Sequence, residues 1–249
     1  MGNNMKNYEV LLFDLDDTLI DNLENVRYAF KKMVEFVGEP YTDAGFDRWY
    51  NLDKQFWIDF HDNKIIVPKE YQDTQEHFVQ YVRSLRYMMY FNGRIDIDKA
   101  FEINELFLRS LNEMVVPVDG AYETLKYLHN KYKIVIATNG PTVAVKSKLT
   151  KIDCINYVND VFSADMTKQT VTKPKKEYFD ELMEYLQYYD REKMLIIGDS
   201  LHSEIKGGMN SQIDSCWLNH SNKELPSGYN PTYTISKLKQ LKKLLWKEE

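Results

Sequence analysis

The sequence contains little cysteine, no excess of positive charge and no long apolar run. Its 249 residues include only Cys154 and Cys216, too few for a disulfide framework and not spaced as metal ligands. The 38 acidic residues outnumber the 32 lysines and arginines, giving a net charge of −6. This balance disfavours binding to a nucleic-acid polymer through its phosphates. With no secretion signal at the start and no apolar run near the roughly 18 residues that span a bilayer, we expect a cytoplasmic protein that does not enter a membrane.

Two sequence patterns, one strand-like and one helical, alternate along most of the chain. Short apolar runs bounded by turn residues have the length and continuity of buried parallel strands. They occupy residues 10–13, 134–137, 161–163, 194–197 and 213–218, and residues 231–235 are expected to add an edge strand. Helical patterns follow at residues 121–131, 142–151, 175–188 and 202–210, with a closing helix at 238–246. This alternation predicts a doubly wound, Rossmann-like α/β core with a parallel sheet.

Residues 20–115 interrupt that alternation with helical patterns alone. Leu23, Val26, Phe30 and Met33 recur at the spacing of one helix face, and further helical patterns cover three more segments. Those segments are residues 43–61, 68–91 and 98–114. We therefore expect a discontinuous α/β core domain of residues 1–19 and 116–249, with a helical domain of residues 20–115 inserted into it.

Carboxylates stand where the first expected strand ends. Asp14 and Asp16 follow the apolar run at residues 10–13, and ligands of open α/β sheets bind at this end of the strands. If the chain stays extended, the two side chains point to the same side. Two carboxylates that close together need a cation or a raised pKa. Mg²⁺, which prefers oxygen ligands, meets that need.

Three further strand ends carry suitable partners for a phosphorylated ligand. Thr138 offers a hydroxyl, and the turn through Asn139 and Gly140 offers amides that can cradle an anion. Lys173 places a cation directly before a proline, and Asp199 places another carboxylate after the run at residues 194–197. Each signal alone is weak, but their order along the chain is specific.

These residues together resemble the motifs of the haloacid dehalogenase-like (HAD) hydrolase superfamily. The matching positions are Asp14-x-Asp16-x-Thr18, Thr138, Lys173-Pro174 and Gly198-Asp199-Ser200. The inserted helical segment is similar to the type-one cap of that superfamily, so the resemblance covers the whole chain. The resemblance implies a Mg²⁺-dependent phosphatase that acts on a small phosphorylated metabolite through an aspartyl-phosphate intermediate.

The resemblance also assigns catalytic roles at the end of the first expected strand. Asp14 would be the nucleophile, and Asp16 would be first the general acid and then the general base. Mg²⁺ would be held by the Asp14 carboxylate, the Asp16 backbone carbonyl and Asp199.

The phosphoryl oxygens would be held by a separate set of residues. Thr138, Lys173 and the amides near Asn139 would bind them, where charge spreads in the transition state.

One position departs from the superfamily pattern. A second acid, commonly Asp, often stands four or five residues after the Asp at the position of Asp199, and here those positions hold Ser203 and Glu204. We expect Glu204 to take that supporting role behind the metal ligands. Its additional methylene puts the geometry of the metal site in question.

Local similarities favour one branch of the superfamily. Residues 55–60, 216–219 and 230–234 look like segments of the pyrimidine 5′-nucleotidases, so a nucleoside monophosphate is the expected substrate. A sugar-phosphate or phosphoglycolate phosphatase, a β-phosphoglucomutase-like phosphotransferase and a non-catalytic binding protein remain alternatives. The aromatic residues of the helical segment are expected to form its core, with one or two available to stack on a base. No oligomeric state is predicted.

Overall fold

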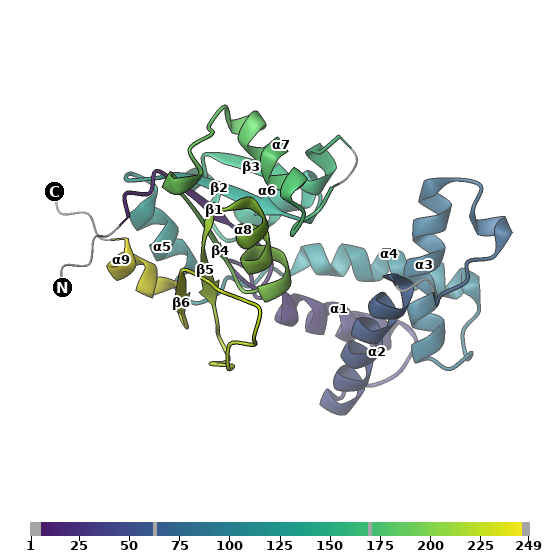
Figure 1. Ribbon diagram of the computed structural model, residues 1–249. Coiled ribbons are helices and arrows are strands. Elements are labelled where there is room, and N and C mark those ends of the chain that lie inside the picture. Colours follow the sequence, from purple (N-terminus) through teal and green to yellow (C-terminus); the bar gives the residue numbers. More distant parts are fainter. Residues whose placement is uncertain (1–5, 62–63, 169–170, 246–249) are drawn as a thin grey trace. The chain divides into compact units, whose positions relative to one another are not determined.

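The structure, a computed structural model, describes residues 6–61, 64–168 and 171–245 (Figure 1). The chain divides into two compact units. One combines the residues up to Asn22 with those from Val115 onward, and the other is Leu23–Met114. Ile20 forms isolated bridges with Asp16 and Pro117, which ties the two passages of the first unit together. Within the described ranges, no helix is both long enough and apolar enough to cross a membrane.

The described residues of the first unit form a six-stranded sheet in the order β3-β2-β1-β4-β5-β6 (Figure 1). Every neighbouring pair is parallel. The strands are β1 (Val10–Phe13), β2 (Lys133–Thr138), β3 (Asp160–Ser163), β4 (Met194–Gly198), β5 (Asp214–Leu218) and β6 (Tyr233–Ile235). The strand order reverses at β1, which lies between β2 and β4. The expected doubly wound α/β fold is therefore confirmed.

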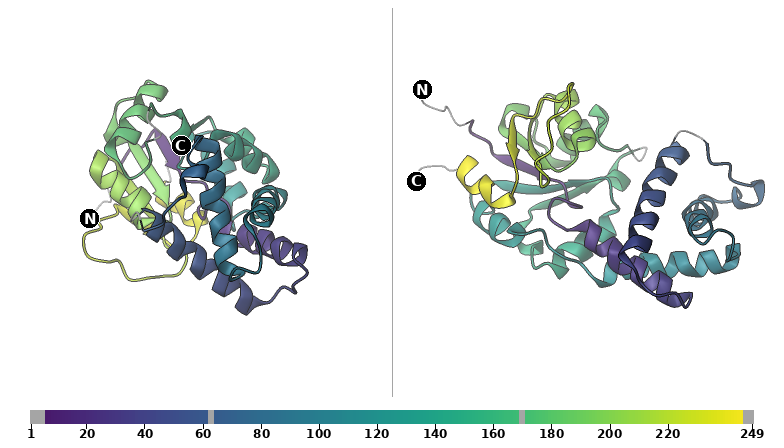
Figure 2. Two further views of the ribbon diagram at one scale, coloured as in Figure 1. Left: turned by 90° about the vertical axis from the view of Figure 1, so that its right-hand side faces the viewer. Right: turned by 90° about the horizontal axis from the view of Figure 1, so that it is seen from below.

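Helices cover both faces of this sheet (Figure 2). They are α5 (Ala121–Leu128), α6 (Thr142–Lys151), α7 (Lys176–Leu186), α8 (Lys206–Ser211) and α9 (Leu241–Leu244). Successive side chains of a strand point to opposite faces. Leu11 and Phe13 accordingly pack in the apolar cluster that contains α5, α6 and α9, whereas Leu12 packs in the cluster that contains α7. The continuous apolar runs follow from this two-sided burial.

The second unit is helical. Its helices are α1 (Asn22–Phe36, which begins in the first unit), α2 (Asp43–His61), α3 (Gln75–Tyr90) and α4 (Ile97–Glu113). Trp49 is fully buried and stacks on Tyr87 with ring centroids 5.2 Å apart, and Phe30 lies 6.4 Å from the same indole. These rings make an aromatic core, as predicted for most of the aromatic residues of this segment.

The helix expected at residues 68–91 is interrupted. Lys69–Tyr71 forms a separate 3-10 turn, and α3 begins only after Thr74. The Thr74 hydroxyl accepts a hydrogen bond from the His77 amide at 3.1 Å, which satisfies one of the free amides at the helix start. This cap places the helix start later than the apolar pattern indicated.

Two helices end earlier than expected. The helix predicted at residues 175–188 ends at Leu186 because Gln187 adopts a left-handed conformation with φ of 52°. The helix predicted at residues 121–131 ends at Leu128. Both errors fall at helix ends, where side-chain periodicity carries little information.

Two further predictions need correction. The helix expected at residues 202–210 is a π-helical turn at Leu201–Ile205 followed by α8. The closing helix is short, with a 3-10 turn before α9, and Trp246 lies outside the described residues. Other 3-10 turns lie at Ile155–Tyr157, Ala164–Met166 and Arg191–Lys193.

Candidate active site

The predicted site residues of the first unit converge at the carboxyl ends of its central strands. Asp14 directly follows β1, Thr138 ends β2 and Asp199 directly follows β4. Because β2, β1 and β4 are neighbours in a parallel sheet, their carboxyl ends meet at one edge. Residues that the sequence places at the ends of different strands therefore lie close together in the structure.

Lys173 brings two of the carboxylates together. Its ammonium donates to Asp14 Oδ1 at 2.7 Å, to Glu204 Oε1 at 2.6 Å and to the Ala137 carbonyl at 2.7 Å. The Lys173 side chain is 1% exposed. Burial opposes its charge, but the Asp14 and Glu204 carboxylates outweigh burial and raise the pKa of Lys173. The lysine is therefore a fixed cation beside Asp14.

The backbone of Lys173 is held by Asn139. The Asn139 side chain accepts a hydrogen bond from the Lys173 amide at 2.8 Å and donates to the Lys173 carbonyl at 3.3 Å. The peptide bond between Lys173 and Pro174 is cis. The Asn139 side chain is thus engaged by Lys173, so the predicted anion-binding role of this turn falls to the Asn139 backbone amide. Thr138 Oγ1 accepts from the Gly140 amide at 3.0 Å, which shapes the turn.

Glu204 reaches the site from the π-helical turn after β4. Its side chain lies across Gly198, where a Cβ would come within 2.2 Å of Glu204 Cγ, so only glycine fits there. Besides binding Lys173, Glu204 accepts a hydrogen bond from the Ser200 amide at 3.1 Å. The residue is 1% exposed. The longer acid thus contacts Lys173 directly, at a position where the superfamily commonly has Asp.

Asp199 is oriented by Thr18, the last residue of the first motif, and by Trp217. Thr18 Oγ1 lies 3.4 Å from Asp199 Oδ1 and accepts from the Asp199 amide at 3.2 Å. The Trp217 indole donates to the Asp199 carbonyl at 2.9 Å. These two contacts give Thr18 a structural role beside Asp199. Trp217 belongs to the nucleotidase-like segment at residues 216–219, but nothing in the sequence predicted its contact with Asp199.

Asp16 has a different cationic partner. Strand β1 ends at Phe13, so the chain is not in regular strand at Asp14 and Asp16. Asp16 Oδ1 accepts a hydrogen bond from Lys148 Nζ at 2.5 Å. Each of the two aspartates is therefore bound to its own lysine. Lys148 was not among the predicted site residues, although it is a charged residue on the apolar face of α6.

Asp14, Asp199 and Glu204 form a group that fits a divalent cation. One carboxylate oxygen from each lies within 4.8 Å of the others. Three carboxylates against the single charge of Lys173 leave an excess of negative charge in a poorly solvated place. Carboxylate oxygens are the ligands that Mg²⁺ prefers. Asp14 and Asp199 would hold the ion, with Glu204 behind them, while the Asp16 carbonyl remains a predicted ligand.

The pKa values of Asp14 and Asp199 also indicate that a cation would stabilise this group of carboxylates. Burial, with repulsion from Glu204, raises the pKa of Asp14 to about 7, although Lys173 opposes the shift. Burial, with repulsion from Asp14 and Asp17, raises the pKa of Asp199 to about 7. A cation bound between the two carboxylates would favour their ionised forms.

These raised pKa values predict a pH-dependent response to metal. Between about pH 4 and pH 7 the folded protein holds protons on Asp14 and Asp199 that the unfolded chain releases, so metal-free stability falls as pH rises through this window. Mg²⁺ should remove that penalty. We expect the increase in Tm on adding Mg²⁺ to be larger at pH 8 than at pH 6. Thermal melts with EDTA or with MgCl₂ test this, and an increase equal at both pH values would contradict it.

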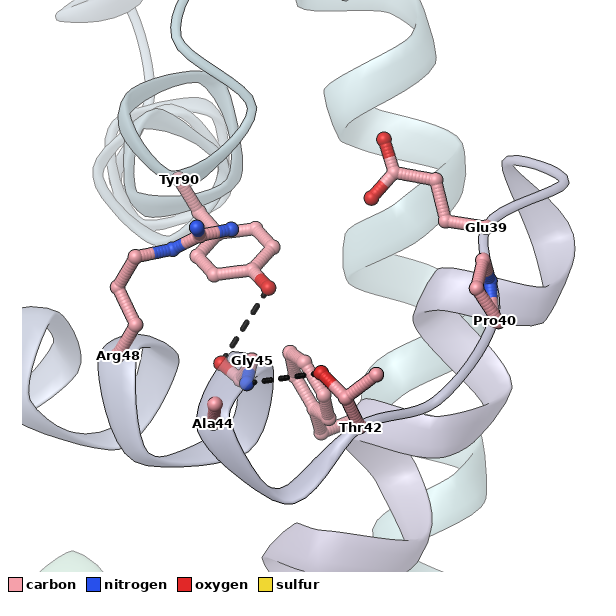
Figure 3. Close-up of a pocket in the computed structure, with 8 residues that line it drawn as sticks. Glu39, Pro40, Thr42, Ala44, Gly45, Arg48 and Tyr90 are labelled. Carbon is pink, nitrogen blue, oxygen red and sulfur yellow. Dashed lines mark hydrogen bonds between the residues drawn. The ribbon is translucent and has the colours of Figure 1, made fainter.

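A pocket of about 320 Å³ lies within the helical unit, between the start of α2 and the end of α3 (Figure 3). The Arg48 guanidinium lies 4.6 Å from the centroid of the Tyr90 ring. The Tyr90 hydroxyl donates to the Gly45 carbonyl at 3.3 Å, and the Gly45 amide donates to Thr42 Oγ1 at 3.0 Å. None of the site residues predicted from the sequence lines this pocket.

The fold is a doubly wound α/β sheet, and three acidic residues and Lys173 lie together at the carboxyl ends of its strands. This arrangement is typical of an α/β enzyme whose active site lies at the strand ends. The sequence profile of the haloacid dehalogenase-like hydrolases matches residues 8–211. The chain belongs to the haloacid dehalogenase-like hydrolase family, and it is an enzyme of the phosphomonoester hydrolase type. The resemblance seen in the motifs is thereby confirmed.

Relatives of known name align over nearly the whole chain. Pyrimidine 5′-nucleotidase YjjG of Escherichia coli is 27% identical, with 96% of this chain and 99% of YjjG covered. Pyrimidine 5′-nucleotidase PynA of Streptococcus pneumoniae is 27% identical, with 92% and 91% covered. YfnB of Bacillus subtilis, which carries the name of a HAD hydrolase, is 30% identical with 97% of each chain covered.

A solved structure of YfnB supports the fold over the same extent. It superposes with a TM-score of 0.82 at 28% identity, covering 96% of this chain and 99% of that one. That YfnB structure is bound to magnesium.

Proposed function

We propose that this hydrolase is a Mg²⁺-dependent pyrimidine 5′-nucleotidase that works through an aspartyl-phosphate. The observation that carries the proposal is the buried Asp14 carboxylate, 2.7 Å from Lys173 and grouped with Asp199 and Glu204 at the end of a central strand. A carboxylate held in this way, beside a fixed cation, is suited to attack a phosphoryl group.

The first half of the reaction joins phosphorus to Asp14. The carboxylate attacks in line as the bond from phosphorus to the ester oxygen breaks, and Asp16 gives its proton to that oxygen. Lys173 and the Asn139 amide bind the phosphoryl oxygens, where negative charge spreads in the transition state. Thr138, which shapes this turn, would supply its hydroxyl to the same oxygens.

The second half releases phosphate. Asp16 takes a proton from water as the water oxygen attacks phosphorus, and Asp14 leaves as a free carboxylate. Asp14, Asp199 and the Asp16 carbonyl would hold Mg²⁺. The ion would reduce the repulsion between the negatively charged Asp14 carboxylate and the negatively charged phosphate of the substrate. Glu204 keeps Lys173 in position through its contact at 2.6 Å.

The helical unit Leu23–Met114 is proposed to be the cap that selects the leaving group. Its insertion shortly after β1 and Asp14 supports this role. Trp49 and Tyr87 are buried in the core of the unit, so they do not meet a substrate base. Trp57 and Tyr81 are only half-buried and are the better candidates for stacking on a base. The Ile58 side chain, which lies in the nucleotidase-like segment at residues 55–60, is outside the described residues.

The nucleotide substrate is supported by sequence similarity along the full chain. Two of the relatives, YjjG and PynA, are named pyrimidine 5′-nucleotidases. The alignments cover 96% and 92% of this chain, so they extend beyond the motifs common to all HAD hydrolases. The nucleotidase-like segment at residues 55–60 of the helical unit agrees with this substrate.

Phosphate release across a substrate panel tests this proposal. We expect dUMP, UMP and dTMP to give kcat/KM at least roughly tenfold above ribose 5-phosphate, which keeps the sugar and the phosphate but lacks the base. EDTA should lower release from all of them roughly 10³-fold. A preference for ribose 5-phosphate, another sugar phosphate or phosphoglycolate would keep the Asp14 chemistry and overturn the nucleotidase assignment. No release from any of these compounds would favour a phosphotransferase or a binding protein.

A further inference from the structure

Lys148 lies on the face of α6 that packs against the sheet. Val145, Leu149 and Ile152 recur at helical spacing and are buried in the core cluster of this face. Lys148 falls on the same stripe, and its side chain is only 13% exposed. A mostly buried ammonium loses hydration, so its place in an apolar stripe requires a compensating partner.

That partner is Asp16. Lys148 Nζ donates to Asp16 Oδ1 at 2.5 Å, although the two residues are 132 positions apart in the sequence. Leu15, next to Asp16, packs in the same apolar cluster as Val145 and Leu149. Packing of α6 against the segment after β1 therefore fixes the position of the ammonium relative to the carboxylate.

The two lysines divide the two aspartates between them. Lys173 binds Asp14 and Glu204, while Lys148 binds Asp16 at the opposite end of the same short segment. Asp16 keeps 36% of its side chain exposed. A carboxylate attached to a short, partly exposed loop has several staggered rotamers available, and one charged contact restricts them.

We propose that Lys148 is the residue that positions Asp16 for proton transfer. By binding Oδ1 it fixes the orientation of the carboxylate and leaves Oδ2 as the oxygen that exchanges a proton. Oδ2 gives its proton to the ester oxygen as the bond from phosphorus to oxygen breaks. The same atom takes a proton back from water as the new bond from oxygen to phosphorus forms. This inference rests on the proposed role of Asp16 but not on the identity of the base in the substrate.

Leaving-group dependence separates this role from a structural one. The ester oxygen of a nucleoside monophosphate is a poor leaving group and needs the proton of Asp16, whereas p-nitrophenolate leaves without one. We expect Lys148→Met to lower kcat/KM for UMP roughly 10²-fold, the size of a general-acid contribution, and for p-nitrophenyl phosphate only about threefold. Lys148→Arg should restore most of the loss. Lys146→Met, an exposed lysine on the same helix, should leave both substrates unchanged.

A double substitution checks that Lys148 acts through Asp16. In the Asp16→Asn background, Lys148→Met should cause no further loss of kcat/KM on either substrate. Lys148→Gln, which retains a hydrogen-bond donor, replaces Lys148→Met if that variant does not fold. Equal losses on both substrates, or a full additional loss in the Asp16→Asn background, would overturn the inference alone. If the wild-type protein hydrolyses neither substrate, the proposed function fails and this inference fails with it.

Discussion

Asp14→Asn is expected to abolish phosphate release, with a loss of at least roughly 10⁴-fold in kcat. The amide is nearly the same size as the carboxylate, so the strand end and the contact to Lys173 can persist, but it is a far weaker nucleophile. The substitution also removes a charge from a buried group whose pKa is raised to about 7. We therefore expect the Tm of the metal-free variant to equal or exceed that of the wild type.

Asp17→Asn is the matched control for this substitution. Asp17 lies three residues away in a left-handed turn with φ of 62°, a conformation that asparagine tolerates well. Its Oδ1 accepts a hydrogen bond from the Asn22 amide at 3.1 Å, and the amide oxygen of the substituted side chain could accept the same bond. Activity should stay within about twofold of wild type. Retained turnover in Asp14→Asn would rule out Asp14 as the nucleophile.

Removing Mg²⁺, like the Asp14→Asn substitution, is expected to cause a large loss of kcat. A metal at this site supplies several kcal/mol of charge stabilisation, and each 1.4 kcal/mol is a tenfold change in rate, so dialysis against EDTA should lower kcat roughly 10³-fold. Added MgCl₂ should restore it. We do not expect the buried carboxylate of Asp14 and the partly buried carboxylate of Asp199 to ionise together beside a substrate phosphate without a compensating cation.

Asp199→Asn locates the ion within the site. The variant should need much more Mg²⁺ for half-maximal activity, and Mg²⁺ should raise its Tm less than that of the wild type. Asp190→Asn, which changes an exposed aspartate on the loop before β4, should behave as wild type in both measurements. Full activity in EDTA, or an unchanged Mg²⁺ requirement in Asp199→Asn, would contradict the assignment of this metal site.

The fold was largely predictable because burial on both faces leaves a strong mark on the sequence. The run at residues 10–13 coincides with β1, and the helix expected at residues 142–151 coincides with α6. Helix ends were less predictable, since they depend on single contacts such as the Thr74 cap. The π-helical turn at Leu201–Ile205 could not be found, because its irregular turn has no period of its own.

Some residues of the candidate site could likewise be predicted from the sequence, and others could not. Asp14 and Asp199 could be found because each follows a strand, and strand ends in a parallel sheet share one edge. The contact of Lys173 with both Asp14 and Glu204 could not be found, because it depends on a loop conformation and on the π-helical turn. Lys148 was visible only as a charged residue in an apolar stripe. Its partner, Asp16, depends on how α6 packs against the segment after β1, which the sequence pattern does not specify.

Chemical trapping of the phosphoenzyme tests the central claim most directly. An acyl phosphate on aspartate is reduced by borohydride to homoserine, so the reaction can be quenched with borohydride during turnover and the peptides mapped by mass spectrometry. We expect homoserine at position 14, only when both Mg²⁺ and a hydrolysed phosphomonoester are present, and none in Asp14→Asn. Homoserine at another aspartate, or an unmodified Asp14 in an enzyme trapped while it turns over, would contradict covalent catalysis by Asp14.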